Sequence, residues 1–109
     1  KGTLTVVEGN IERVINHINA QIKSHHARHQ KVGVIATEDT KDRFNTPYVF
    51  NVGNPHHDTD IASNLYIALR TMDQLNIDMI YSLASHESKY KEAIMNRLYK
   101  AANNRIKKV

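Results

Sequence analysis

The sequence predicts an α/β fold of three layers around a mostly parallel sheet of four to five strands. Short apolar, β-branched segments alternate along the chain with segments whose apolar residues recur at helical spacing. Residues 32–37 are apolar almost throughout, as in a strand buried on both faces. The 109 residues are enough for one domain with a modest core. Alternating strands and helices imply βαβ units and a Rossmann-like layout.

The first strand and helix are separated by Gly9 and Asn10. Residues 4–7 favour a strand. Asn10 is a good N-cap, and Glu12 stands in the first helical turn, where the helix dipole favours a carboxylate. A helix over about residues 11–24 is predicted by an apolar stripe: Ile11, Val14, Ile15, Ile18 and Ile22.

The middle of the chain predicts two strands and a long helix. The strands cover residues 32–37 and 48–52, and the polar loop between them has room for one helical turn. Asp58 or Asp60 can cap a helix over about residues 59–75. Its apolar stripe is formed by Ile61, Leu65, Ala68, Leu69 and Met72.

The last part of the chain predicts a fourth strand at residues 78–83 and a helix over about residues 90–103. Asn103 and Asn104 can end this helix, since asparagine tolerates the left-handed conformation. Residues 106–109 can add a short edge strand. The helix is expected to bury Ile94, Leu98 and Ala101, with help from Met95 and Ala102.

Composition and charge exclude several classes of protein. The chain has no cysteine, which excludes disulfide and thiolate chemistry and fits a cytoplasmic location. No apolar run approaches the roughly 18 residues of a membrane span, so no membrane partner is expected. The net charge is +6 from Lys89 onward and −2 over residues 1–88. This basic end favours an anionic partner, or it is simply a solvated helix face.

Ligands of parallel α/β sheets bind at the carboxyl ends of the strands. The most polar of these ends contains Thr37 and Glu38, followed by Asp39 and Thr40. This cluster can bind a hydroxyl or a metal-bridged group, although such clusters more often cap a turn. Neither a G-x-G-x-x-G motif nor a P-loop is present.

Polar residues on the last two predicted helices are further candidates. Asn64 and Arg70 lie on the polar side of one helix, and Asn96 and Arg97 lie off the apolar stripe of the other. The planar fork of arginine suits a phosphate, and a helix N-terminus near Ser88 would add a favourable dipole. The alternative is a surface of ordinary salt bridges.

The seven histidines raise the question of a metal site. His25 and His29 are four residues apart and would share a helix face if the first helix extended that far, while His56, His57 and Asp58 fall in a loop. A zinc site needs three or four convergent ligands, and the spacing does not bring these groups together. We therefore assign no metal ligand, and no catalytic residue follows from the spacing either.

Three segments resemble a known family. They are GVIATEDT at residues 33–40, IASNLYIALRTMD at 61–73, and AIMNRL at 93–98 followed by Lys100-Ala101-Ala102. Their order and patterns are similar to the C-terminal accessory domain of two-domain threonylcarbamoyl-AMP synthases, in the Sua-five/YciO/YrdC/YwlC group. The chain departs from that family just before Ala93, where residues 88–92 replace a glycine-rich turn. The replacement argues against a backbone phosphate cradle there.

The resemblance implies a role in tRNA modification. The parent enzyme is a nucleotidyltransferase that combines L-threonine, bicarbonate and ATP, with magnesium, into threonylcarbamoyl-adenylate and pyrophosphate, for threonylcarbamoyladenosine synthesis. Its chemistry resides in an N-terminal YrdC-like domain, which is absent from this chain. Residues 1–109 would form one non-catalytic domain without a cofactor, docked on that domain. Nucleotide or docking contacts would come from Thr37, Glu38, Asn64, Arg70, Asn96 and Arg97.

Two alternatives stay open. One is a small nucleotide-binding module that holds ATP or AMP at the strand ends. The other is a tRNA-binding adaptor that uses the basic C-terminal helix, with Tyr90 and Tyr99 interleaved among its charges.

Overall fold

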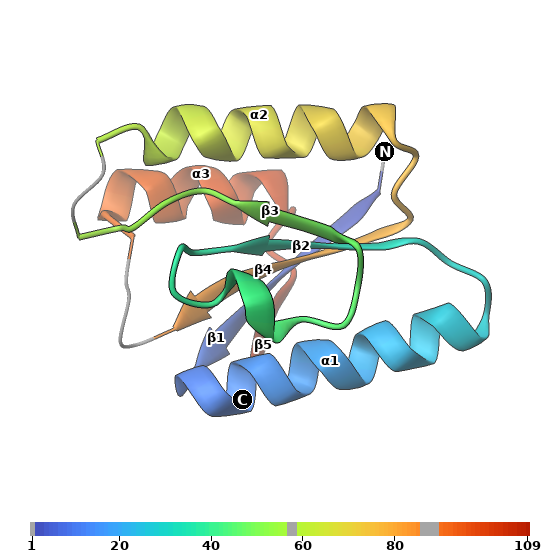
Figure 1. Cartoon of the computed structure of the whole chain (residues 1–109). Coiled ribbons are helices and arrows are strands. Elements are labelled where there is room, and N and C mark those ends of the chain that lie inside the picture. Colours follow the sequence, from blue (N-terminus) through green and yellow to red (C-terminus); the bar gives the residue numbers. More distant parts are fainter. Residues whose placement is uncertain (1, 57–58, 86–89) are drawn as a thin grey trace.

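The molecule has three layers, with one sheet between helices on its two faces (Figure 1). The computed structural model describes residues 2–56, 59–85 and 90–109. The elements follow the chain in this order: β1 (Thr3–Gly9), α1 (Ile11–Ala27), β2 (Val32–Ala36), the 3₁₀ turn η1 (Lys41–Arg43), β3 (Tyr48–Asn51), α2 (Ile61–Gln74), β4 (Met79–Ser85), α3 (Glu92–Ala101) and β5 (Ile106–Lys108).

The strand order is β3-β2-β4-β1-β5, and the pairings between neighbouring strands are parallel. The predicted α/β class is confirmed, with five strands in the sheet. The crossover through α1 leaves room for one strand between β1 and β2, and β4 enters that gap after α2. β4 is therefore the central strand and pairs with both β1 and β2.

Each face of the sheet has its own core. α1 covers one face, and α2 and α3 cover the other (Figure 1). Neighbouring strand residues point to opposite sides, so Val6 packs in the core under α2 and α3 while Val7 packs in the core under α1. The apolar stripe predicted for the first helix is confirmed, since four of its residues are buried in the α1 core: Val14, Ile15, Ile18 and Ile22.

The helix ends differ from the predictions by a few residues. Asn10 caps α1 as predicted, because its Oδ1 accepts hydrogen bonds from the N–H groups of Glu12 and Arg13. α1 continues to Ala27 rather than ending near residue 24, since buried His25 bonds to Tyr81 through Nε2. None of the described helices is both long and apolar enough to cross a membrane.

The later helices start later than predicted. α2 begins at Ile61, with Asp60 in the N-cap position but without a side-chain capping bond, and Asp58 lies outside the described residues. α3 begins at Glu92 rather than at residue 90. The stop at Asn103 and Asn104 is confirmed by their left-handed φ angles of 52° and 60°.

The buried side of α3 also differs from the prediction. Leu98 and Ala102 are fully buried, and Ile94 is half-buried. Ala101, expected in the core, is exposed. It lines a groove between α3 and α2. The helix therefore packs through a narrower stripe than its apolar residues suggested.

Candidate functional site

The carboxyl end of β2 forms a closed polar turn. Thr37 is only 1% exposed. Its hydroxyl donates to Asp39 Oδ1 at 2.6 Å and lies 2.9 Å from the hydroxyl of Thr40. Thr40 Oγ1 also accepts the backbone N–H of Thr37 at 3.1 Å. The hydroxyls of Thr37 and Thr40 are thus engaged within the turn, which favours the turn-capping interpretation of this cluster.

Two other candidate residues lie at the same end of the sheet. Glu38 accepts from Asn51 Nδ2 at 2.5 Å and pairs with Lys41 Nζ at 3.2 Å. Asn64 donates through Nδ2 to the carbonyl oxygen of Val52 at 3.0 Å. This bond ties the first turn of α2 to the segment after β3. The structure therefore brings Thr37, Glu38 and Asn64 to one region, where their contacts hold loops together.

A small hollow lies between the starts of α2 and α3. It measures about 80 Å³ and is lined by Pro55, Thr59, Ile61, Tyr90, Lys91 and Ile94. Tyr90 is 5% exposed, and its hydroxyl has no hydrogen-bond partner among the described residues. Burial, and after it the negative charge of Asp39, raise the pKa of Tyr90. The tRNA-binding alternative included the ring of Tyr90, but a ring that is buried in this way is not available to stack on a base.

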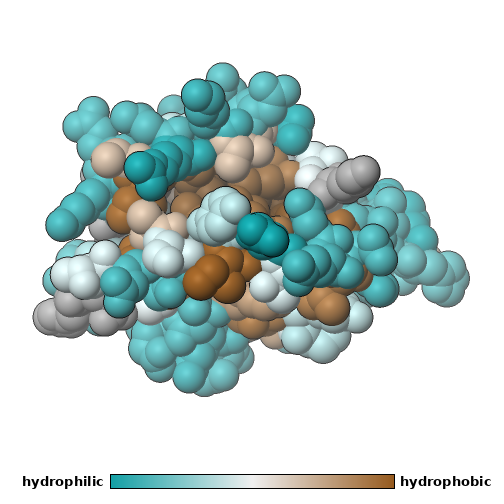
Figure 2. All heavy atoms as spheres, turned by 90° about the horizontal axis from the view of Figure 1, so that it is seen from above, coloured by the Kyte–Doolittle hydropathy of each residue, from teal (hydrophilic) through white to brown (hydrophobic). Residues whose placement is uncertain are grey.

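The remaining candidates lie on α2 and α3, and of these Arg97 lines the groove between the two helices, which we call the α2–α3 groove. Its volume is about 200 Å³, and it is lined by Ala62, Leu65, Tyr66, Leu69, Ile94, Arg97 and Ala101. Figure 2 looks onto this face and shows apolar surface between polar side chains. Arg70 donates to the Tyr66 hydroxyl at 3.2 Å and lies 5.7 Å from the centroid of its ring. Asn96 is exposed on α3, next to Arg97.

The six candidate residues thus divide between two places. Thr37, Glu38 and Asn64 lie at the strand ends, whereas Arg70, Asn96 and Arg97 lie on the two helices that flank the groove. The sequence analysis missed Tyr66 and Ala101. Tyr66 carried a signal, because it and Ile67 are large apolar residues outside the stripe that packs on the sheet. Ala101 carried none, because its helical position fitted the core.

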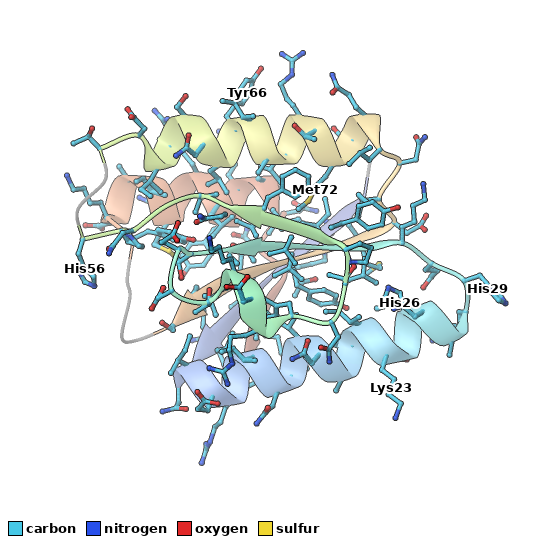
Figure 3. The ribbon with its side chains drawn as sticks, viewed as in Figure 1. Lys23, His26, His29, His56, Tyr66 and Met72 are labelled. Atoms are coloured by element: carbon cyan, nitrogen blue, oxygen red, sulfur yellow. The ribbon has the colours of Figure 1, made fainter. Side chains whose placement is uncertain are left out.

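The histidine groups lie far apart. His29, just beyond α1, and His56, after β3, lie at opposite ends of the molecule (Figure 3). His25 and His29 do not share a helix face, since α1 ends at Ala27 and His29 has a left-handed φ of 60°. His57 and Asp58 lie outside the described residues. Within residues 2–56, 59–85 and 90–109, no three His, Cys, Asp or Glu side chains are arranged to hold a metal ion.

Tyr99 fastens α3 to the sheet. Its hydroxyl donates to the carboxylate of Glu8, near the end of β1. This bond, followed by partial burial and by the negative charge of Glu8, raises the pKa of Tyr99 to about 12. The phenol of Tyr99 therefore keeps its proton in the folded protein at a pH where an unfolded tyrosine, with a pKa of about 10, has lost it.

This difference predicts a pH dependence of stability. Because the folded pKa is raised, the contribution of the bond is fully present below about pH 10 and is lost as the pH rises through about 12. The gap in unfolding free energy between the unmodified protein and Tyr99→Phe should therefore narrow over that range, as measured by urea denaturation. In a chain that carries Glu8→Gln, which removes the charge, the gap between Tyr99 and Tyr99→Phe should narrow at a lower pH. A gap that stays constant from pH 9 to pH 12 would contradict the assignment.

Comparisons with known proteins agree with the resemblance. Residues 1–103 match the family model described as threonylcarbamoyl-AMP synthase, C-terminal domain. The chain is 34% identical over 103 residues to threonylcarbamoyl-AMP synthase of Bacillus subtilis (strain 168), covering 94% of this chain and 29% of that protein. The chain is also 36% identical over 104 residues to threonylcarbamoyl-AMP synthase of Pyrococcus abyssi (strain GE5 / Orsay), covering 95% of this chain and 29% of that protein.

Solved structures show the same fold. The C-terminal Sua5 domain of a hypothetical protein from Pyrococcus horikoshii superposes with a TM-score of 0.80 at 32% identity, covering all of this chain and 98% of that one. Pyrococcus abyssi Sua5 complexed with L-threonine superposes with a TM-score of 0.82 at 35% identity, covering 99% of this chain and 30% of that one. The chain thus spans about 29% of the length of the curated relatives it matches. It belongs to the family of threonylcarbamoyl-AMP synthase C-terminal domains.

Proposed function

We propose that this chain acts as the accessory domain of a threonylcarbamoyl-AMP synthase. A YrdC-like catalytic domain of the same polypeptide would join L-threonine, bicarbonate and ATP into threonylcarbamoyl-adenylate, in the cytoplasm, for tRNA modification. The observation that carries this proposal is the family match across residues 1–103. The length of the matched relatives supports it, since each leaves about 70% of its sequence for other domains.

The geometry of the strand ends supports a non-catalytic role. General acid–base catalysis needs a group with a pKa near the working pH that lies within hydrogen-bond reach of the substrate. Here Thr37 is held by Asp39, Glu38 contacts Asn51 and Lys41, and the amide of Asn64 supports the loop after β3. These contacts suit a rigid scaffold. ATP and magnesium would bind in the catalytic domain, and this domain would influence the reaction by docking on it.

Pyrophosphate release tests the proposal. The full polypeptide that carries this domain is incubated with MgATP, L-threonine and bicarbonate, in parallel with the isolated chain of residues 1–109. We expect release from the full polypeptide that depends on threonine, and none from the isolated chain. Turnover by the isolated chain would overturn the non-catalytic role, and a full polypeptide without threonine-dependent release would overturn the family function.

A further inference from the structure

His25 is a buried titratable side chain that joins the end of α1 to the central strand. It is 7% exposed and is the one buried histidine among the described residues. Its Nε2 lies 2.9 Å from the hydroxyl of Tyr81 on β4, and the centroids of the two rings are 6.0 Å apart. No Asp or Glu in the described part of the chain forms an ion pair with His25. The protonation of the ring therefore depends on its hydrogen-bond partners.

The Nδ1 atom of His25 has two partners that compete for it. Nδ1 lies 2.7 Å from Oε1 of Gln30 and 2.9 Å from Nη2 of Arg28. A ring nitrogen of histidine carries either one proton or one lone pair. The amide oxygen of Gln30 only accepts, so its bond needs a protonated Nδ1, whereas the guanidinium of Arg28 only donates and needs an unprotonated Nδ1. The two hydrogen bonds therefore exclude each other.

The other ring nitrogen keeps its partner in both cases. The hydroxyl oxygen of Tyr81 accepts from a protonated Nε2, and the hydroxyl donates onward to Oε1 of Gln21 at 3.5 Å. Burial raises the pKa of Tyr81, and the positive charge of Arg28 opposes this to a smaller extent. The phenol thus keeps its proton between about pH 5 and 8, where histidine ordinarily titrates. Only the proton on Nδ1 distinguishes the two states.

Each state releases one of the two competing partners. With an unprotonated Nδ1, the ring accepts from Arg28, and the amide oxygen of Gln30 loses its donor. With a protonated Nδ1, the ring donates to Gln30 and carries a positive charge, which repels the guanidinium. Arg28 is exposed, so its side chain can move into water. The charged ring is also favoured by its place in the last turn of α1, where the helix dipole stabilises a cation.

We propose that His25 is a pH-sensitive switch at the end of α1. The neutral ring holds Arg28, and the protonated ring releases Arg28 and binds Gln30 in its place. Because residues 28–31 connect α1 to β2, the switch sets the conformation of this connection. One proton frees a guanidinium at the end of the molecule that also carries His29 (Figure 3). The switch goes beyond the proposed function, since it depends only on contacts within this domain.

Nuclear magnetic resonance of the chain of residues 1–109 tests this switch. The matched Pyrococcus horikoshii domain has nearly the same extent, since the superposition covers 98% of it, so a chain of this length forms the fold alone. The nitrogen chemical shifts of the His25 ring report which nitrogens carry a proton. The order parameter of the Nε–Hε bond of Arg28 reports whether the guanidinium is held. Both are followed from about pH 8 to about pH 5.

At the upper pH we expect a proton on Nε2 of His25 alone and a rigid Arg28. On acidification Nδ1 should gain a proton, and in the same step the order parameter of Arg28 should fall below about 0.6, the range of a flexible group. His26→Gln is the matched control, because His26 is the exposed neighbour, and it should leave this step unchanged. An order parameter of Arg28 that stays constant while Nδ1 gains its proton would overturn the switch. A His25 ring that keeps one protonation state over the whole range would overturn it too.

Two variants separate the competing partners of His25. Arg28→Met removes a positive charge and the donor to the unprotonated Nδ1, so the midpoint of the His25 titration should move up by about one pH unit. Gln30→Met removes the acceptor of the protonated Nδ1, so the midpoint should move down by about one pH unit, as for the loss of one hydrogen bond to a charged group. Neither side chain is buried, so both variants should fold. Shifts in the same direction, or no shift in either variant, would contradict the competition.

Discussion

Replacing Leu98 by alanine should lower the unfolding free energy of the domain by about 3 kcal/mol, which lies within the range for a fully buried leucine. Leu98 is the fully buried residue of α3 and belongs to the core beneath α2 and α3. Removing its side chain loses the transfer free energy of the deleted carbons and leaves a cavity that the sheet and two helices cannot close. Urea denaturation followed by circular dichroism measures the loss.

Two variants of the same region serve as controls. Lys100→Ala, at an exposed position of the same helix, should change the unfolding free energy by no more than about 0.5 kcal/mol. Leu98→Met, which keeps the side-chain volume, should cost less than about 1.5 kcal/mol. If Leu98→Ala cost no more than Lys100→Ala, α3 would not be packed on the sheet as described.

Gly9→Ala should cost about 2 to 3 kcal/mol, because two effects coincide at this position. Gly9 has φ 147°, a conformation that side chains rarely adopt. A Cβ there would also lie 2.4 Å from the carbonyl oxygen of Val109. That oxygen cannot move freely, since Val109 donates its N–H to the carbonyl oxygen of Glu8 at 2.8 Å. The alanine therefore strains the turn after β1 and also pushes the last residues away from β1.

Deleting residues 106–109 separates the two effects. In the shortened chain the contact with Val109 is gone. The loss of unfolding free energy caused by Gly9→Ala should then fall to the strain of the positive φ angle alone, about 1 to 2 kcal/mol. In the chain of residues 1–109, amide exchange should show that β5 opens faster with Gly9→Ala than without it. A loss of unfolding free energy below about 0.5 kcal/mol in that chain would contradict both the φ angle and the contact.

The candidate site was predictable in part. Thr37 and Glu38 follow a strand that is apolar throughout, and the rule that parallel strands bind ligands at their carboxyl ends selects them directly. The hydrogen bonds of Thr37 to Asp39 and Thr40 confirm the turn that such residues favour. The α2–α3 groove was not predictable in this way, because a groove depends on the distance between two helices, and no pattern within either helix encodes that distance.

The sequence by itself determined the elements and their type. Apolar spacing identified the three helices, short apolar runs identified four strands and left residues 106–109 as an optional fifth, and Asn10, Asn103 and Asn104 marked helix ends, because these signals act between residues a few positions apart. The tertiary structure alone decided the insertion of β4 between β1 and β2, the burial of Tyr90 and the exposure of Ala101. Each of these depends on contacts between segments distant in the chain, where the sheet and the opposing helix, rather than local spacing, decide which side chains meet solvent.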